Sequence, residues 1–199
     1  MIDRRVLLAV AAMLLAQSCA TPQATQAPAA ASNAQIALRN PGFEESPPPR
    51  EECPPGWGCL AHAGPGSFRY FVDESNPGAG KKSLCIQRID PVQPWAKVAQ
   101  GIRYTTPRGV RMRFSGLVRT QAVKGRGAGP IVVVQGGGGE ILATQSQPVV
   151  GDTAWHPFSV EVDVPVQAFL LDVGVALEGD GLACFDDLRL EVVSGGGRV

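Results

Sequence analysis

The sequence predicts an all-β domain after residue 35, built as an antiparallel jelly roll or β-sandwich. Several segments alternate apolar and polar side chains with a period of two, which gives a strand one apolar face. No long segment repeats its apolar residues with the 3.6-residue period of a helix. The 24 glycines and 17 prolines interrupt the chain at short intervals, as expected for strands joined by turns.

The clearest alternation lies in the segments 110–118, 155–164 and 168–178. In 155–164, for example, Ser159 and Glu161 face one side while the valines face the other. Each of these segments therefore predicts a half-buried antiparallel strand. Further strands are predicted at 36–39, 67–73, 83–89, 97–104, 131–135, 140–146 and 188–192.

Four consecutive glycines at 136–139 predict a hairpin turn between two of these strands. A phosphate-binding loop is excluded here, because no helical pattern and no Lys-Ser or Lys-Thr pair follows the glycines. About ten short strands in a domain of this size imply two packed sheets.

The first 18 residues are predicted to be a lipoprotein signal peptide. Arg4 and Arg5 precede the apolar run 6–15, which is shorter than the about 20 residues that a membrane-spanning helix needs. The sequence AQSC at 16–19 resembles a lipobox, so we expect Cys19 to carry the lipid. The alternative is an ordinary signal peptide cleaved nearby, with Cys19 incidental.

The segment 19–35 is predicted to be the lipidated cysteine followed by a disordered tether. It has no charged, aromatic or large aliphatic side chain before Ile36, so it buries too little apolar surface to offset its ordering entropy. Ala20, where other lipoproteins carry an aspartate for inner-membrane retention, indicates a cell-envelope protein of the outer membrane. The jelly-roll domain is predicted to span 36–193, and the tail 194–199 is predicted to be flexible.

The charge of the chain excludes one class of partner. Its 18 basic and 18 acidic side chains give a net charge of zero, and no basic stripe is present. Nucleic acid is therefore not an expected partner.

Four cysteines besides Cys19 favour two disulfides in an exported chain. Three pairings are possible. Cys53 and Cys59 enclose the turn-forming sequence PPGWG, so we pair them, and Cys85 and Cys184 then remain for each other. The alternative is that Cys85 and Cys184 are buried free thiols. Metal binding is less favoured, because the spacing is not that of a CxxC pair and the chain has only two histidines.

A series of short motifs follows the order found in one family. The domain resembles carbohydrate-binding modules of the family 4 and 9 type, which are galactose-binding-like jelly rolls. The resemblance covers about 36–193 and implies that fold, together with glycan binding. The motifs lie at 40–44 (NPGFE), 56–57, 83–86, 100–102, 114–120, 151–155, 164–165, 179–181 and 185–191 (FDDLRLE).

The resemblance also implies a structural calcium ion where the two ends of the domain meet. Glu44 and Asp187 are the matching positions, and calcium prefers six to eight oxygen ligands. The alternative is that these carboxylates cap turns or pair with Lys81, Lys82 or Arg189.

Glycan recognition needs aromatic platforms and planar polar groups. Trp57, Trp95 and Tyr104 are the candidate platforms, and Gln100 and Arg119 are the candidate polar arms. The competing interpretations are that Trp57 plugs an end of the sandwich and that Arg119 is a solvated strand residue.

No catalytic constellation is found, so we expect a protein that is not an enzyme. His62 and His156 have no orienting partner in the sequence, and Asp186 and Asp187 are adjacent on a strand and so cannot flank one bond. We therefore expect an envelope lipoprotein that binds a polysaccharide. The alternative is a structural or assembly module that uses the same fold for protein–protein contacts.

Overall fold

The computed structural model describes residues 34–48, 53–62, 66–103 and 108–195. These residues belong to one compact unit, which spans Asn33–Val199, and they form strands, turns and loops. In the described part of the chain there is no helix of the length and apolar character needed to cross a membrane. The predicted lipid site Cys19 and the candidate platform Tyr104 lie outside the described residues.

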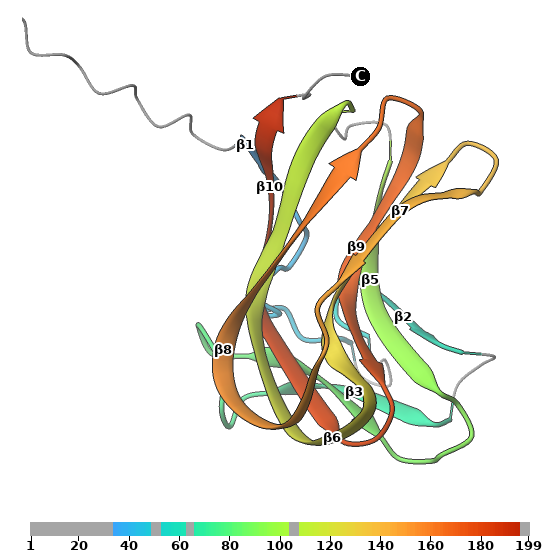
Figure 1. Ribbon diagram of the computed structural model, residues 1–199. Helices are drawn as coiled ribbons and strands as arrows, with labels where there is room; N and C mark the ends of the chain where they lie inside the picture. Colours follow the sequence, from blue (N-terminus) through green and yellow to red (C-terminus); the bar gives the residue numbers. More distant parts are fainter. Residues whose placement is uncertain (1–33, 49–52, 63–65, 104–107, 196–199) are drawn as a thin grey trace, which may run out of the picture. The chain divides into compact units, whose positions relative to one another are not determined.

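The strands form one continuous ten-stranded sheet that folds over into two facing layers, the first and the second sheet, and all the pairings are antiparallel (Figure 1). This arrangement confirms the predicted all-β jelly roll. The first sheet contains β3 (Phe68–Asp73), β4 (Ser83–Arg88), β10 (Leu182–Gly195), β1 (Ala34–Ile36), the first part of β6 (Val110–Gly136) and the end of β8 (Val149–Val164). The second sheet contains β2 (Gly58–Ala61), β5 (Trp95–Arg103), β9 (Ala168–Glu178), the last part of β6 and β7 (Ile141–Ser146).

Strand β6 belongs to both sheets. Residues 110–121 pair with β10, whereas residues 127–136 pair with β9. Between these two parts the chain bends, with positive φ angles at Ala122, Gly125 and Gly127. A Cβ atom on Gly127 would lie 2.7 Å from the carbonyl oxygen of Val149, so only glycine fits against the neighbouring strand.

The prediction of two separate strands at 110–118 and 131–135 was therefore wrong. The glycine-rich connection between them indicated a loop, but its residues continue the pairing with β8 through several register shifts. Bulges of this kind bend a strand without ending it. The predicted hairpin at 136–139 is present, with the Gly139 amide donating to the Gly136 carbonyl over 3.1 Å.

Other strand ends also differ from the prediction. Strand β2 was not predicted, β8 begins at Val149 instead of residue 155, and β10 begins at Leu182 and runs on to Gly195. The start of β10 was missed because both of its faces are covered. Its outward-facing Cys184 and Asp186 are as buried as its core residues, so it shows no apolar–polar alternation.

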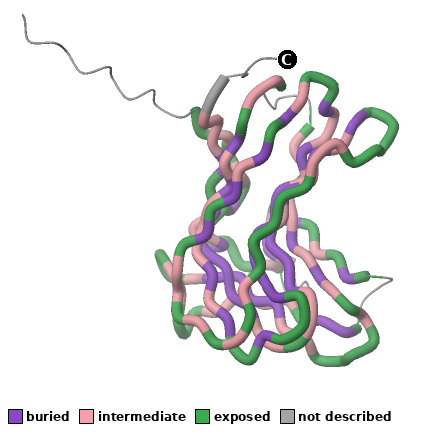
Figure 2. The backbone as a smooth tube through the Cα atoms, in the orientation of Figure 1, coloured by how far each residue is buried: buried purple, intermediate pink, exposed green. Residues whose placement is uncertain are grey.

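The core lies between the inner faces of the two sheets, and buried positions alternate with more exposed ones along strands such as the first part of β6 and the end of β8 (Figure 2). Phe43 and Trp57 pack against each other with ring centroids 5.4 Å apart and are almost fully buried. The largest fully buried side chains include Phe114, Phe185, Leu84, Ile86, Met112, Leu171, Leu177, Leu188 and Leu190.

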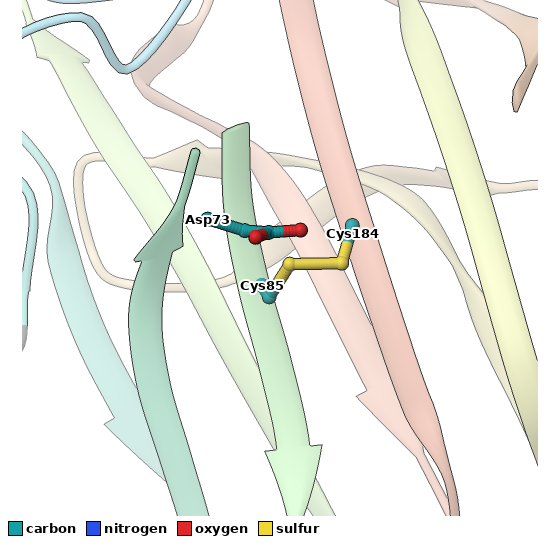
Figure 3. Close-up of side chains that lie close together, drawn as sticks. All are labelled: Asp73, Cys85 and Cys184. Atoms are coloured by element: carbon teal, nitrogen blue, oxygen red, sulfur yellow. A yellow bond between two sulfur atoms is a disulfide. The ribbon is translucent and has the colours of Figure 1, made fainter. Parts of the chain in front are cut away.

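Both predicted disulfides are present in the structure, which confirms the pairing. Cys53 and Cys59 close a short loop before β2, with Cα atoms 5.7 Å apart. Cys85 and Cys184 join β4 to β10 at directly opposite positions, 99 residues apart in the sequence. Figure 3 shows this bond with the carboxylate of Asp73 beside it.

We predict that the variant Cys85→Ala/Cys184→Ala loses about 4.7 kcal/mol of unfolding free energy, because the bond closes a loop of about a hundred residues in the unfolded chain. The matched variant Cys53→Ala/Cys59→Ala should lose only about 2.4 kcal/mol, since its loop is short. Guanidinium unfolding of both variants measures the difference. Equal losses would contradict the loop-length argument.

Candidate functional site

A groove lies on the outer face of the second sheet, near the start of β5 and the end of β9. Its volume is about 330 Å³. Trp95 lies opposite Glu178 and Lys97 lies opposite Ala176 in the pairing of the two strands. The residues that line the groove include Leu60, Trp95, Lys97, Arg126, Ala176 and Glu178.

The period of the strands puts these side chains on one face. In β5, Ala96 and Val98 point into the core, so Trp95 and Lys97 point outward. In β9 the outward positions include the small residues Gly174 and Ala176. Only glycine fits at position 174, because the backbone of β5 passes so close that a Cβ atom there would lie 2.2 Å from the carbonyl oxygen of Val98. Of these two residues, Ala176 lines the groove, together with Ile131 of β6.

Trp95 forms one wall of the groove. Its ring is half-buried and meets the ring of His62 edge-on, with centroids 5.7 Å apart. The His62 Nδ1 atom is in turn 3.2 Å from the side-chain oxygen of Gln93. An aromatic ring fixed at the side of a groove is suited to stacking against a flat apolar surface.

Two ion pairs supply the polar groups of this face. The Lys97 ammonium group contacts Asp172, and both side chains are largely buried. The Arg126 Nε atom lies 3.2 Å from Glu178 Oε2. The Lys97–Asp172 contact is shielded from solvent and holds its donor in place, which lowers the entropy cost of binding a polar ligand, whereas the Arg126 side chain is largely exposed.

The structure places three of the predicted ligand residues apart from one another. Trp95 lies in the groove. Trp57 is only 7% exposed, and its indole nitrogen donates to the Asn40 carbonyl over 3.0 Å. This burial matches the competing interpretation, in which Trp57 plugs an end of the sandwich. Gln100 is tied to the backbone of Arg39, accepting from its amide at 3.1 Å and donating to its carbonyl at 2.6 Å.

Arg119 lies on the outer face of the first sheet, not beside Trp95. Its guanidinium group donates to Asp73 over 3.1 Å and to the sulfur of Cys184 over 3.3 Å. The same group lies over the ring of Trp155, 5.5 Å from the centroid. The Trp155 indole nitrogen donates to the carbonyl of Asn76, in the loop that joins β3 to β4. The prediction that Arg119 and Trp95 share one surface was therefore wrong.

The predicted calcium residues have other partners in the structure. Glu44 Oε1 accepts from the backbone amide of Lys81 over 2.8 Å, and Asp187 pairs with Arg189 over 2.7 Å. Both contacts match the alternative in which these carboxylates cap a turn or pair with a cation. Calcium at Glu44 and Asp187 stays a prediction.

Among the described residues, one group of three possible metal-ligating side chains lies within 4.8 Å: Asp73, Cys85 and Cys184. Its two sulfur atoms are bonded to each other, so this group is a disulfide with a neighbouring carboxylate.

Asp186 has a structural role that the sequence did not indicate. It is fully buried, and its carboxylate accepts from the amides of Gly78, Ala79 and Asp187 at 3.0, 2.8 and 2.7 Å. Burial raises the pKa of Asp186 above its usual value, although the three amide donors act in the opposite direction. The carboxylate thereby fastens the loop between β3 and β4 to the middle of β10.

The comparisons with known proteins agree with this geometry at the level of the fold. No protein-family model matches the chain. A xylan-binding domain, CBM22-1 of Xyn10C from Paenibacillus barcinonensis, superposes with a TM-score of 0.58 at 18% identity, over 83% of this chain and 100% of that one. The fold is that of a carbohydrate-binding module. This fold confirms the resemblance found in the sequence.

Two further solved structures of such modules are similar. A structure described as "CBM4 structure and function" has a TM-score of 0.51 at 18% identity and covers 78% of this chain and 99% of its own. TmCBM61 in complex with β-1,4-galactotriose has a TM-score of 0.50 at 19% identity, over 77% of this chain and 95% of that one. At these identities the likeness establishes the fold.

A curated relative comes from Bacillus subtilis (strain 168), where it is described as the uncharacterized HTH-type transcriptional regulator YbfP. It is 26% identical over 143 residues, which make up 69% of this chain and 48% of the relative. The chain therefore spans about half the length of the curated relative it matches.

We predict that Asp186→Ala lowers the unfolding free energy by about 3 kcal/mol or more, because three buried amides lose their acceptor and each costs about 1–3 kcal/mol when unsatisfied. Urea unfolding measures this loss. The control is Asp187→Asn at the neighbouring, partly exposed position, where asparagine tolerates the positive φ of 49°. A similar loss in both variants would contradict the role of Asp186.

Proposed function

We propose that this domain is a non-catalytic module that binds a β-1,4-linked polysaccharide in the groove beside Trp95. The observation that carries the proposal is that the half-buried Trp95 ring lines one groove together with Ala176, Lys97 and the Arg126–Glu178 ion pair. Two proteins of the same fold support the choice of ligand, since one is described as a xylan-binding domain and another was solved with β-1,4-galactotriose.

The groove offers both kinds of contact that a sugar ring needs. The face of Trp95 stacks on the apolar C–H face of a pyranose ring. Lys97 and Arg126 donate hydrogen bonds to hydroxyl oxygens, and Glu178 accepts them from hydroxyl groups.

Binding without catalysis is supported by the state of two carboxylates: Glu178, which lines the groove, and Asp172, which pairs with the groove residue Lys97. Asp172 is engaged by Lys97 and Glu178 by Arg126. A glycosidase needs one carboxyl group to donate a proton and another to act as base or nucleophile. Two carboxylates that are each paired with a cation suit a binding role instead.

The location of the domain is part of the same proposal. A lipid on Cys19 and a tether up to residue 35 fit a module that captures polysaccharide at the cell envelope, on the outer membrane. Several acyl chains make such an anchor stable, at about 0.8 kcal/mol for each buried methylene group.

We predict that Trp95→Ala weakens binding of the full chain to xylan or β-1,4-galactan at least about tenfold, equal to about 1.4 kcal/mol, because the stacking platform is lost. Affinity electrophoresis in gels containing each polysaccharide measures the change, with and without calcium. The matched control is Ile141→Ala, an exposed apolar residue of the same sheet outside the groove. Unchanged binding in Trp95→Ala would move the site elsewhere. Absence of binding by the wild type would favour the protein-contact alternative.

We predict that the full chain expressed in a Gram-negative host incorporates labelled palmitate and sediments with the outer membrane. The variant Cys19→Ala should take up no label, because it lacks the thiol that receives the lipid. Membrane fractionation and autoradiography measure both properties. Label retained in Cys19→Ala would refute the lipobox.

A further inference from the structure

A second cavity of about 510 Å³ adjoins the groove, at the loops beyond the end of the second sheet. We call it the loop cavity. Its walls differ in composition from those of the groove, with more proline and glycine. Besides the residues it shares with the groove, it is lined by Arg88, Pro91, Val92, Pro94, Gly125 and Gly179.

The outer wall of the loop cavity is held in place by Arg88. Its guanidinium group donates to the carbonyls of Asp90 and Pro91 at 3.1 and 2.6 Å, and it lies 3.4 Å from Asp180. The amide of Val92 donates to the Asp90 side chain over 2.9 Å. Val92 is nevertheless 73% exposed, so a braced loop presents an apolar side chain to solvent beside the cavity.

The groove and the loop cavity share three lining residues, Trp95, Arg126 and Glu178. Glu178 pairs with Trp95 of β5 on one side and with Gly127 of β6 on the other. The shared residues therefore form a row across the end of the sheet, and the two cavities lie on either side of that row.

Two glycines with positive φ angles set the position of Arg126. Gly125 has φ of 87° and Gly127 has φ of 108°. A Cβ atom on Gly125 would lie 3.0 Å from the Glu178 carbonyl oxygen, so the backbone passes close to the end of β9. As a result the Arg126 side chain reaches Glu178 although it is 86% exposed.

We propose that the loop cavity is a second subsite for the same glycan chain, and that Arg126, oriented by Glu178, binds the chain where it passes from one cavity to the other. This inference rests on the proposed function. Each cavity has a volume in the range of small-ligand sites. The guanidinium fork has several donors in one plane, which suits adjacent hydroxyl groups. An ion pair this exposed contributes little to stability, so it can exchange contacts with a ligand.

The test is titration calorimetry of the full chain with xylobiose, which fills one subsite, and with xylohexaose, which reaches both. The wild type should bind xylohexaose at least about tenfold more tightly than xylobiose, which is about 1.4 kcal/mol. Arg126→Ala should remove most of this gain, so the affinity for xylohexaose should fall by a larger factor than the affinity for xylobiose, which loses only the Arg126 contact made inside the groove. Arg126→Lys should restore the gain only in part, because lysine keeps the charge and loses the fork.

Two controls separate this inference from the proposed function. Arg111→Ala removes an arginine that pairs with Glu161 on the other sheet, and it should change neither affinity. Ala176→Leu enlarges a side chain that lines the groove and should weaken binding of both sugars. Absence of binding to both sugars by the wild type overturns the proposed function. Binding with no length gain, or with the full gain kept in Arg126→Ala, overturns the second subsite alone.

Discussion

The rest of the structure depends on one continuous two-stranded ribbon. Strand β6 forms one side of this ribbon, and β7 and β8 form the antiparallel other side. Because this ribbon pairs with β10 in one sheet and with β9 in the other, it fixes how the two sheets face each other. The bend is made by residues with positive φ, which a straight strand excludes. The same bend places Arg126 at the end of the second sheet, so the geometry of the groove follows directly from the turn in the ribbon.

The two outer faces of the sandwich have different roles. On the first sheet, Asp73, Arg119 and Trp155 contact one another or the buried disulfide, and Asp186 secures a loop nearby. Polar groups on that face are used to hold the fold together. On the second sheet, a groove is lined by Trp95 and by charged side chains that form ion pairs. The stabilising contacts lie on the outer face of the first sheet, so the outer face of the second sheet is available for a ligand.

Much of the fold could be predicted from the sequence because the alternation of apolar and polar residues reports directly which face of a strand is buried. The prediction failed where that signal was absent, as in the start of β10, whose outward residues Cys184 and Asp186 are also buried. It failed again at 119–130, because in the sequence a glycine-rich segment that bends a strand looks the same as a glycine-rich loop that ends one.

The candidate site was less accessible to prediction. Trp95 could be named from its residue type, but Lys97 and Asp172 resemble ordinary solvated strand residues, and they meet only through a pairing of segments 75 residues apart. Trp57 and Arg119 have the right chemistry, and only packing shows that one is buried and the other lies on the opposite sheet. The residue type limits which side chains are candidates for ligand binding, whereas the register of strand pairing decides which of these side chains lie together.

The glycine hairpin between β6 and β7 makes the domain easy to label or immobilise. At its tip, a Cβ atom on Gly137 would meet nothing within 4 Å, and Gly137 has none of the positive φ angles found at other glycines. A side chain can therefore be added there without a clash at its Cβ atom, for example a cysteine that is then coupled to a dye or a biotin group. Gly137 lines neither the groove nor the loop cavity. A sensor surface coupled through this turn would hold every molecule in the same orientation.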